Sequence, residues 1–221
     1  MFRGTWVSGA LATVTGGQVG TASSSLFGFQ WVSTGIPAPA TFTSSPYYQT
    51  GFATSLVPKI CMITQVEVNV VVTTTPATAQ DLSLGLFFVN GYTALGTGGT
   101  LATMTIGNQG LDSNMGLSNF ATSTSYTSGN GGIQIATTTN LGTLTGTVSL
   151  YPSRVWSGYT NTVGQGLIEP FPLEYGNDLN TQSLWIRTNQ GFTIQPLTAW
   201  ATVVANLYVT VEWIEMSSNY T

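Results

Sequence analysis

Three carboxylates fall within ten residues of one another in the long irregular loop 151–180. They are Glu169, Glu174 and Asp178. Two carboxylates can act as the acid and the base of a glycosidase, and carboxylate oxygens are also ligands that calcium prefers. Loops carry most charged residues in any case, because strands cannot bury them, and we favour this simpler interpretation.

Most other catalytic chemistries are excluded by residue type. The chain has no histidine, which removes Ser–His and Cys–His nucleophiles and zinc sites built from His and Cys. No glycine-rich loop ends in Lys-Ser or Lys-Thr, as a phosphate-binding P-loop requires. Asp112 and Asn114 resemble the start of a calcium loop, but no acidic residue follows at the required spacing. We therefore expect no catalysis, no cofactor and no metal.

Four aromatic residues of the same region could form a platform for stacking on a sugar ring. They are Trp156, Tyr159, Phe171 and Tyr175. Aromatic residues in loops between sheets more often pack against a neighbour or against the end of a sandwich. Glycan binding is therefore the weaker of the two interpretations.

Two stretches with strict period-two alternation predict strands, and these strands would position any functional side chains of the loops. In 65–72 the valines at even positions alternate with Gln65, Glu67 and Asn69, and in 82–88 leucines alternate with Ser83 and Gly85. Side chains alternate across a strand, so each stretch predicts a strand with one apolar face. The Pro-containing loop 73–81 between them predicts a long antiparallel hairpin, which the dipeptide Asn90-Gly91 ends as a turn.

The rest of the chain supplies further strands and no helical periodicity. We expect strands at 27–31, 101–106, around Ile133 and Ile135, at 144–150 with a bend or bulge at Gly146, and at 203–215. Segments 183–187 and 192–194 predict a tight hairpin in which Gly191 supplies positive φ. Residues 107–131 are expected to be mostly loop, with one short helical turn in 112–120. The fold class is therefore an all-β antiparallel sandwich, of jelly-roll type, with long loops rich in Gly, Thr, Ser and Asn.

The composition indicates a subunit of an assembly. Only 5% of the residues are charged, against about 25% in an ordinary soluble protein. A surface with so little charge does not oppose association. Four basic residues and a net charge of −4 leave no basic footprint for nucleic acid. No apolar run is long enough for a transmembrane helix, a cleaved signal peptide is not expected, and Cys61 is expected to be a small buried hydrophobe.

Residues 1–25 are interpreted as an extended N-terminal arm, and 26–221 as a single β-sandwich domain. The arm is rich in Gly, Ser and Thr, so it has little tendency to fold alone, and Phe2 and Trp6 are its large apolar side chains. We expect these two residues to be assembly contacts, so that deleting residues 2–20 leaves the melting temperature unchanged. The alternative is that the arm adds an edge strand to its own sheet through Leu11, Thr13 and Thr15.

The strands 65–70 and 208–213, with their Gly-, Thr-, Ser- and Asn-rich connecting loops, give the chain a resemblance to bacteriophage virion structural proteins. The similarity is to head-decoration, fibre-base and capsid proteins built on a jelly roll. The resemblance implies a non-enzymatic capsid-associated subunit whose partners are copies of itself and other capsid proteins, with no nucleic acid and no membrane. It also implies a location in the virion after synthesis in the host cytoplasm, where an unpaired cysteine is usual. The alternative is a lectin-like surface module that binds a glycan.

Overall fold

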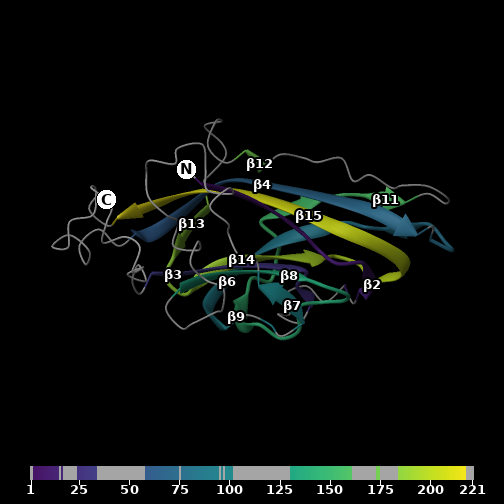
Figure 1. Ribbon diagram of the computed structural model, residues 1–221, viewed down its shortest axis with the longest axis horizontal. Coiled ribbons are helices and arrows are strands. Elements are labelled where there is room, and N and C mark those ends of the chain that lie inside the picture. Colours follow the sequence, from purple (N-terminus) through teal and green to yellow (C-terminus); the bar gives the residue numbers. More distant parts are fainter. Residues whose placement is uncertain are drawn as a thin grey trace, which may run out of the picture.

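The computed structural model describes residues 2–14, 16, 24–33, 58–74, 76–94, 96, 98–101, 130–160, 173–174 and 184–217. Within these ranges the regular structure is almost entirely strand, and every strand pairing is antiparallel. The strands form two sheets that lie face to face (Figure 1). The predicted all-β sandwich is therefore confirmed.

The first sheet is built around the two longest strands. Its strands are β1 (Phe2–Val7), β2 (Leu11–Val14), β4 (Pro58–Thr74), β12 (Leu173–Glu174), β13 (Leu184–Arg187) and β15 (Trp200–Ser217). Their order is β1-β15-β4-β12, with β2 also on β15 and β13 also on β4.

The second sheet faces the first and contains the shorter strands. Its strands are β3 (Phe27–Ser33), β6 (Leu84–Ala94), β7 (Gly99–Leu101), β8 (Asn130–Ala136), β9 (Thr145–Val148), β10 (Arg154–Trp156) and β14 (Gln190–Pro196). Their order is β10-β6-β14-β3-β8-β7, with β9 also on β6, and β5 (Gln80–Asp81) pairs separately with β11 (Tyr159–Thr160).

The apolar face of β4 lies in the core, as its alternation predicts. Val68 pairs with Val209 of β15 and Val66 pairs with Val211, and all four side chains are buried. β-Branched side chains pack well on a pleated surface, which favours strands here. The predicted core residues are all buried: Val66, Val68, Val70, Val72, Leu84, Leu86, Val209, Val211 and Trp213.

An aromatic cluster joins the two sheets. Trp213 of β15 lies edge-on to Phe29 of β3, with ring centroids 5.6 Å apart, and Phe29 stacks on Phe192 of β14 at 5.1 Å. Trp6 of β1 stacks on Trp213 at 6.4 Å and also contacts Phe27 at 5.7 Å. Such pairs add to the free energy that burial alone supplies.

The predicted hairpin between β4 and β6 is wrong. β4 pairs with β15, β12 and β13, whereas β6 pairs with β14, β9 and β10 in the other sheet. Segment 75–83 therefore connects the two sheets instead of turning within one. Alternation defines the apolar face of each strand but not its pairing partner. The two apolar faces can be buried in one sheet of neighbouring strands or in two sheets that face each other.

The two predicted turn glycines also have other roles. Gly91, with φ of 62°, lies inside β6. Between the cross-strand pairs Asn90–Thr147 and Ala94–Thr145, three residues of β6 lie opposite the single residue Gly146 of β9. This is a β-bulge, which confirms the irregularity predicted at Gly146. The turn before β14 takes its positive φ from Asn189 (60°), not from Gly191.

β13 and β14, which that turn connects, belong to different sheets, so the predicted tight hairpin is not a paired one. Gly191 is required for another reason. A Cβ atom there would lie 2.0 Å from the carbonyl oxygen of Phe29 on the neighbouring strand.

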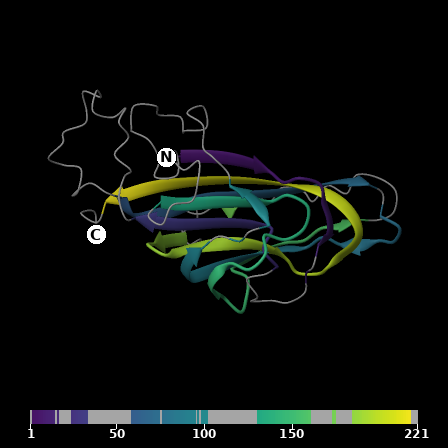
Figure 2. The same cartoon turned by 60° about the horizontal axis from the view of Figure 1, so that its bottom comes forward.

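Residues 2–14 belong to the sandwich, which corrects their interpretation as part of an arm. All of β1 pairs with β15, from Phe2 with Trp213 to Val7 with Tyr208, and β2 pairs farther along the same strand. Trp6 is only 7% exposed, and Leu11 of β2 is fully buried. The backbone groups along this edge of β15 need partners, and β1 and β2 supply them. Figure 2 shows β1 (purple) alongside β15 (yellow).

Several expected elements lie outside the described residues. These are the strand beyond Leu101, the loop up to residue 129 with its helical turn at 112–120, and most of 161–183. Of the predicted strand 144–150, β9 covers 145–148.

Replacing Val68 with Asp should lower the free energy of unfolding by more than about 3 kcal/mol, because it places an unpaired charge between the sheets. Chemical denaturation measures the loss. Thr74→Asp, at an exposed position of the same strand, should change stability by less than about 0.5 kcal/mol. If both variants unfold at the same denaturant concentration, the assignment of the β4 face is wrong.

Trp6→Ala should destabilise the isolated chain by about 3–5 kcal/mol, because the indole is buried against Trp213 and Phe27. The neighbouring Val7 is 48% exposed, so Val7→Ala should cost less than about 1 kcal/mol. Thermal and urea unfolding of both variants checks this pair. An unchanged melting temperature in Trp6→Ala would restore the arm interpretation.

Candidate functional site

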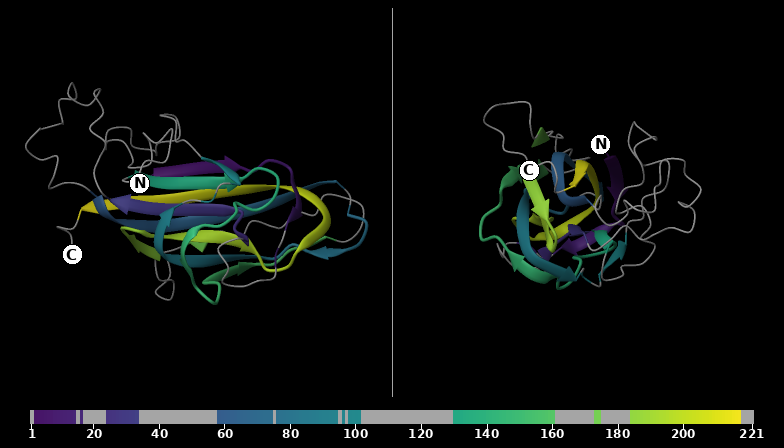
Figure 3. Two further views of the ribbon diagram at one scale, coloured as in Figure 1. Left: turned by 90° about the horizontal axis from the view of Figure 1, so that it is seen from below. Right: turned by 90° about the vertical axis from the view of Figure 1, so that its left-hand side faces the viewer.

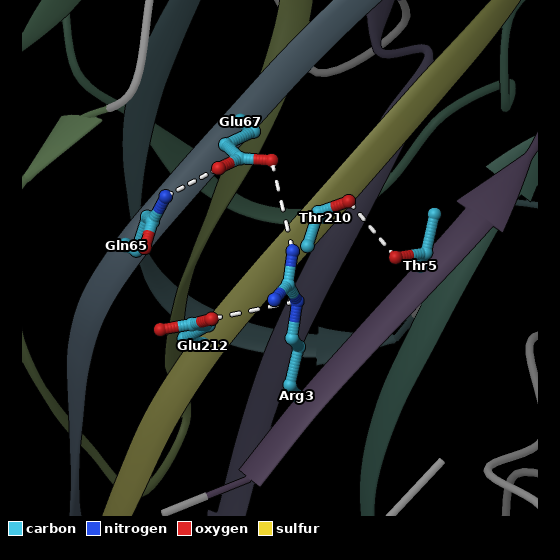
Figure 4. Close-up of polar contacts among 6 residues, drawn as sticks. All are labelled: Arg3, Thr5, Gln65, Glu67, Thr210 and Glu212. Carbon is cyan, nitrogen blue, oxygen red and sulfur yellow. Dashed lines mark hydrogen bonds and ion pairs between the residues drawn. The ribbon is translucent and has the colours of Figure 1, made fainter. Parts of the chain in front are cut away.

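Charged residues gather on the outer face of the first sheet, where three adjacent strands contribute to one cluster (Figure 4). Arg3 of β1 lies directly opposite Glu212 of β15, and Glu212 lies opposite Gln65 of β4. Two residues along, Thr5, Thr210 and Glu67 form a second cross-strand row. Alternation places both rows outside because Val66, Val68, Val209 and Val211 face inward.

One guanidinium serves two carboxylates in this cluster. Arg3 Nε lies 3.4 Å from Glu212 Oε1, and Arg3 Nη2 lies 4.0 Å from Glu67 Oε2. Gln65 Nε2 donates to the other oxygen of Glu67, and the hydroxyls of Thr5 and Thr210 are 2.9 Å apart. The Glu212 side chain is 13% exposed, while those of Arg3 and Glu67 are 57% and 33% exposed.

This arrangement links three neighbouring strands through one guanidinium. The contacts tie β1 to β15 and β4. Arg3 is the ion-pair partner of both Glu67 and Glu212.

Cys61 is fully buried in the first sheet, as predicted for a small hydrophobe. Burial, and to a lesser extent the negative charge of Glu215, raises the pKa of the Cys61 thiol well above its ordinary value. The thiol is therefore protonated at neutral pH and is not a nucleophile.

The structure separates the aromatic residues predicted to stack on a glycan. Trp156 is 1% exposed in β10, paired opposite Leu84, so its ring has no face for a sugar and this part of the prediction is wrong. Tyr159 is 67% exposed on β11 and remains a candidate. Phe171 and Tyr175 lie outside the described residues.

The acidic candidates are mostly outside the described ranges. Glu169, Asp178, Asp112 and Asn114 are not among the described residues, and of Glu174 only the backbone, paired in β12 with Gln65, is described. Among the side chains that are described, no three of His, Cys, Asp and Glu come close enough to hold a metal ion.

Of the predicted assembly contacts, Trp6 is a core residue and is not available to a neighbour. For Phe2 the structure describes the backbone, which pairs with Trp213. Sequence reasoning missed a different set of apolar residues. Leu150 and Tyr151, before β10, are 71% and 80% exposed, and Val155 in β10 is 50% exposed.

Comparisons with known proteins identify no relative. The chain matches no family model, no curated protein and no solved structure. Within the described part of the chain, no helix has the length and apolar character needed to cross a membrane.

The ion pair between Arg3 and Glu212 should contribute about 0.5–1 kcal/mol, because Arg3 is more than half exposed and water screens the pair. A double-mutant cycle with Arg3→Met and Glu212→Gln measures this coupling by urea unfolding. The coupling should shrink in 1 M salt, where the Debye length is about 3 Å. In a control cycle that combines Arg3→Met with Asp81→Asn, at a residue outside the cluster, the two changes in unfolding free energy should be additive. Equal coupling energies in both cycles would refute the ion pair between Arg3 and Glu212.

Cys61 should make folding less favourable at alkaline pH. In the unfolded chain the thiol ionises near pH 8.5, whereas in the folded chain it stays protonated to higher pH. The contribution of the protonated Cys61 thiol to stability is thus complete below about pH 8.5 and declines as the pH rises above that value. The difference in unfolding free energy between the wild type and Cys61→Ala should therefore change between about pH 8 and pH 10, with the wild type losing more. A pH-independent difference would contradict the raised pKa.

Proposed function

We propose that the chain is a non-enzymatic structural subunit of a virion, of jelly-roll type, associated with a capsid as a decoration, minor capsid, or vertex or fibre-base protein. Its role is to cover and join neighbouring subunits through weakly charged faces. This proposal includes the finer fold assignment, because a jelly roll is one particular strand order within the sandwich class.

The strand order supports the jelly roll. Eight strands can be counted in chain order as β1, β3, β4, β6, β10, β13, β14 and β15. If these eight strands are numbered one to eight in that order, the first sheet has the strand order 1-8-3-6 and the second sheet has the order 2-7-4-5. The strands labelled β7 and β8 are additions to the second sheet beside β3. The first strand thus pairs with the last, the second with the seventh, the third with the sixth and the fourth with the fifth. This nested pairing is what a long hairpin rolled into two sheets produces.

The surface is the observation that carries the functional proposal. Large apolar side chains are exposed at several places on the sandwich, among them Leu150, Tyr151, Val155 and Trp185. The whole chain has only twelve charged residues. Contiguous exposed apolar groups on a weakly charged surface, such as the neighbours Leu150 and Tyr151, are characteristic of faces that another protein covers. Fold analogy alone does not choose between capsid and lectin domains, because both use jelly rolls.

The lectin-like alternative is weaker than the sequence implies. Its proposed stacking platform loses Trp156 to the core. Tyr159 is still exposed, beside Asp81 on the paired strand β5. A single aromatic ring gives a sugar one stacking face, and so glycan binding enters here as an outcome of the test.

Mass spectrometry of particles purified from cells that naturally produce the chain tests this proposal. We expect the chain to sediment with the particles and to be present in many copies per particle. A chain that sediments only as a free small protein, and that binds glycans in a way lost in Tyr159→Ala, would overturn the proposal.

A pair of matched variants tests the role of the exposed apolar residues in the same preparation. Leu150→Lys with Tyr151→Lys should reduce incorporation into particles, because each lysine charges a surface that a neighbour covers. Thr145→Lys with Thr147→Lys adds the same charge at exposed positions of the nearby strand β9 and should be incorporated normally. Equal incorporation of the two double variants would show that the 150–151 surface is not a contact.

A further inference from the structure

The outer face of the first sheet carries three apolar side chains in one cross-strand row, here called the apolar row. Trp185 of β13 lies opposite Met62 of β4, and Met62 lies opposite Ile214 of β15. The chain neighbours Ile186 and Trp213 are buried between the sheets, so alternation places the apolar row outside. The right-hand view of Figure 3 shows β4 (blue), β15 (yellow) and β1 (purple) side by side near the top of the sandwich.

The apolar row is partly exposed to solvent. Trp185 is 51% exposed, and Met62 and Ile214 are intermediate between buried and exposed. Contiguous apolar side chains on a surface mark sites of interaction with other molecules. Tryptophan is also among the residue types that most often dominate the binding energy between proteins. The apolar row therefore has the composition of the centre of an interface.

Opposite charges flank the apolar row on its two sides. Arg187 of β13 is exposed and lies opposite Ile60, two residues along β4 from Met62. On the other side is the polar cluster, where the single guanidinium of Arg3 faces two carboxylates, which leaves an excess of negative charge (Figure 4). One of these carboxylate side chains, that of Glu67, is 33% exposed. The face is thus positive on one side of the row and negative on the other.

These positions make the face complementary to a second copy of itself. In a two-fold dimer, a patch of one copy contacts a second patch of its partner, and the reverse contact is identical. Arg187 is level with Ile60 of β4 and Glu212 is level with Gln65, so Met62 lies between these two levels. A two-fold axis in the plane of the interface, crossing β4 beside Met62, therefore places Arg187 of each copy against the polar cluster of the other. The two apolar rows then cross each other at the centre.

We propose that this face binds a second copy of the chain and forms a two-fold dimer. The apolar rows make the centre of the interface, and Arg187 of each copy lies against the polar cluster of its partner. The charges on the two flanks set the orientation and exclude other arrangements, while burial of Trp185 supplies affinity. A second copy is the occupant that fits, because it alone brings both charges in the required positions. The inference goes beyond the proposed function and does not require the chain to be a virion subunit.

Sedimentation equilibrium of the purified full chain measures this dimer. We expect a reversible equilibrium between monomer and dimer whose Kd rises with salt concentration, because salt screens the flanking charges. Trp185→Ala should raise the Kd by about tenfold or more. Tyr159→Ala removes an exposed aromatic ring from β11, outside the first sheet, and should leave the Kd unchanged.

An exchange of charges tests the orientation of the two copies. Arg187→Glu makes both flanks of the row negative, and Glu67→Lys gives the polar cluster an excess of positive charge. Each variant alone should therefore dimerise more weakly than the wild type. In a mixture of the two variants, every flank of one chain meets the opposite charge on the other, so a heterodimer should form about as tightly as the wild-type dimer. A variant that had merely lost its fold would not recover on mixing.

Three results would overturn the proposal: a wild-type chain that stays monomeric at every concentration, equal Kd values for Trp185→Ala and Tyr159→Ala, or charge variants that associate no better in the mixture than alone. The first result would mean that any partner of this face is a different protein.

Discussion

The structure depends on β15, which is used on both of its edges and both of its faces. One edge pairs with β1 and β2 and the other with β4, so the first sheet is organised around this strand. Its inward face carries Val209, Val211 and Trp213 into the core, and its outward face carries Thr210 and Glu212 into the polar cluster. A change in its register by one residue would exchange these two faces. The N-terminal strand, the aromatic cluster and the Arg3 ion pairs therefore all require the same alignment of β15.

The strands could be predicted from the sequence because their signal is local, whereas several pairings could not. The alternation in 65–72 and 203–213 defines the buried face of each strand without reference to any partner. Connection 73–81 suits a hairpin and also a crossing between sheets, and the alternation is the same in both. Asn90-Gly91 signals a residue with positive φ, but a bulge inside a long strand uses that conformation as a hairpin turn does. Long-range pairing decides between such options, and no short segment encodes it.

The polar cluster could not be predicted from the sequence, because the composition of the N-terminal segment suggests a flexible arm. Gly4 and Trp6 alternate with Arg3 and Thr5, which is a strand pattern, but the Gly- and Ser-rich stretch that follows suggests a flexible arm. The entropy cost of ordering this segment is offset by its pairing with the edge of β15, and the local sequence does not reveal that pairing. Trp156 illustrates the opposite error, because an aromatic residue beside a loop suggests exposure until its pairing opposite Leu84 is known. The low charge content, by contrast, is a property of composition and does not depend on which strands pair.

Native-state hydrogen exchange of the β1 amides tests most directly whether β15 organises the N-terminal strand into the sandwich. The account predicts that the β1 amides that bond to β15 are protected by more than about 2 kcal/mol of opening free energy in the isolated chain. The central amides of β4 and β15 should exchange only through global unfolding. Exchange of the β1 amides at the rate of an unstructured peptide, with β4 and β15 still protected, would contradict the account.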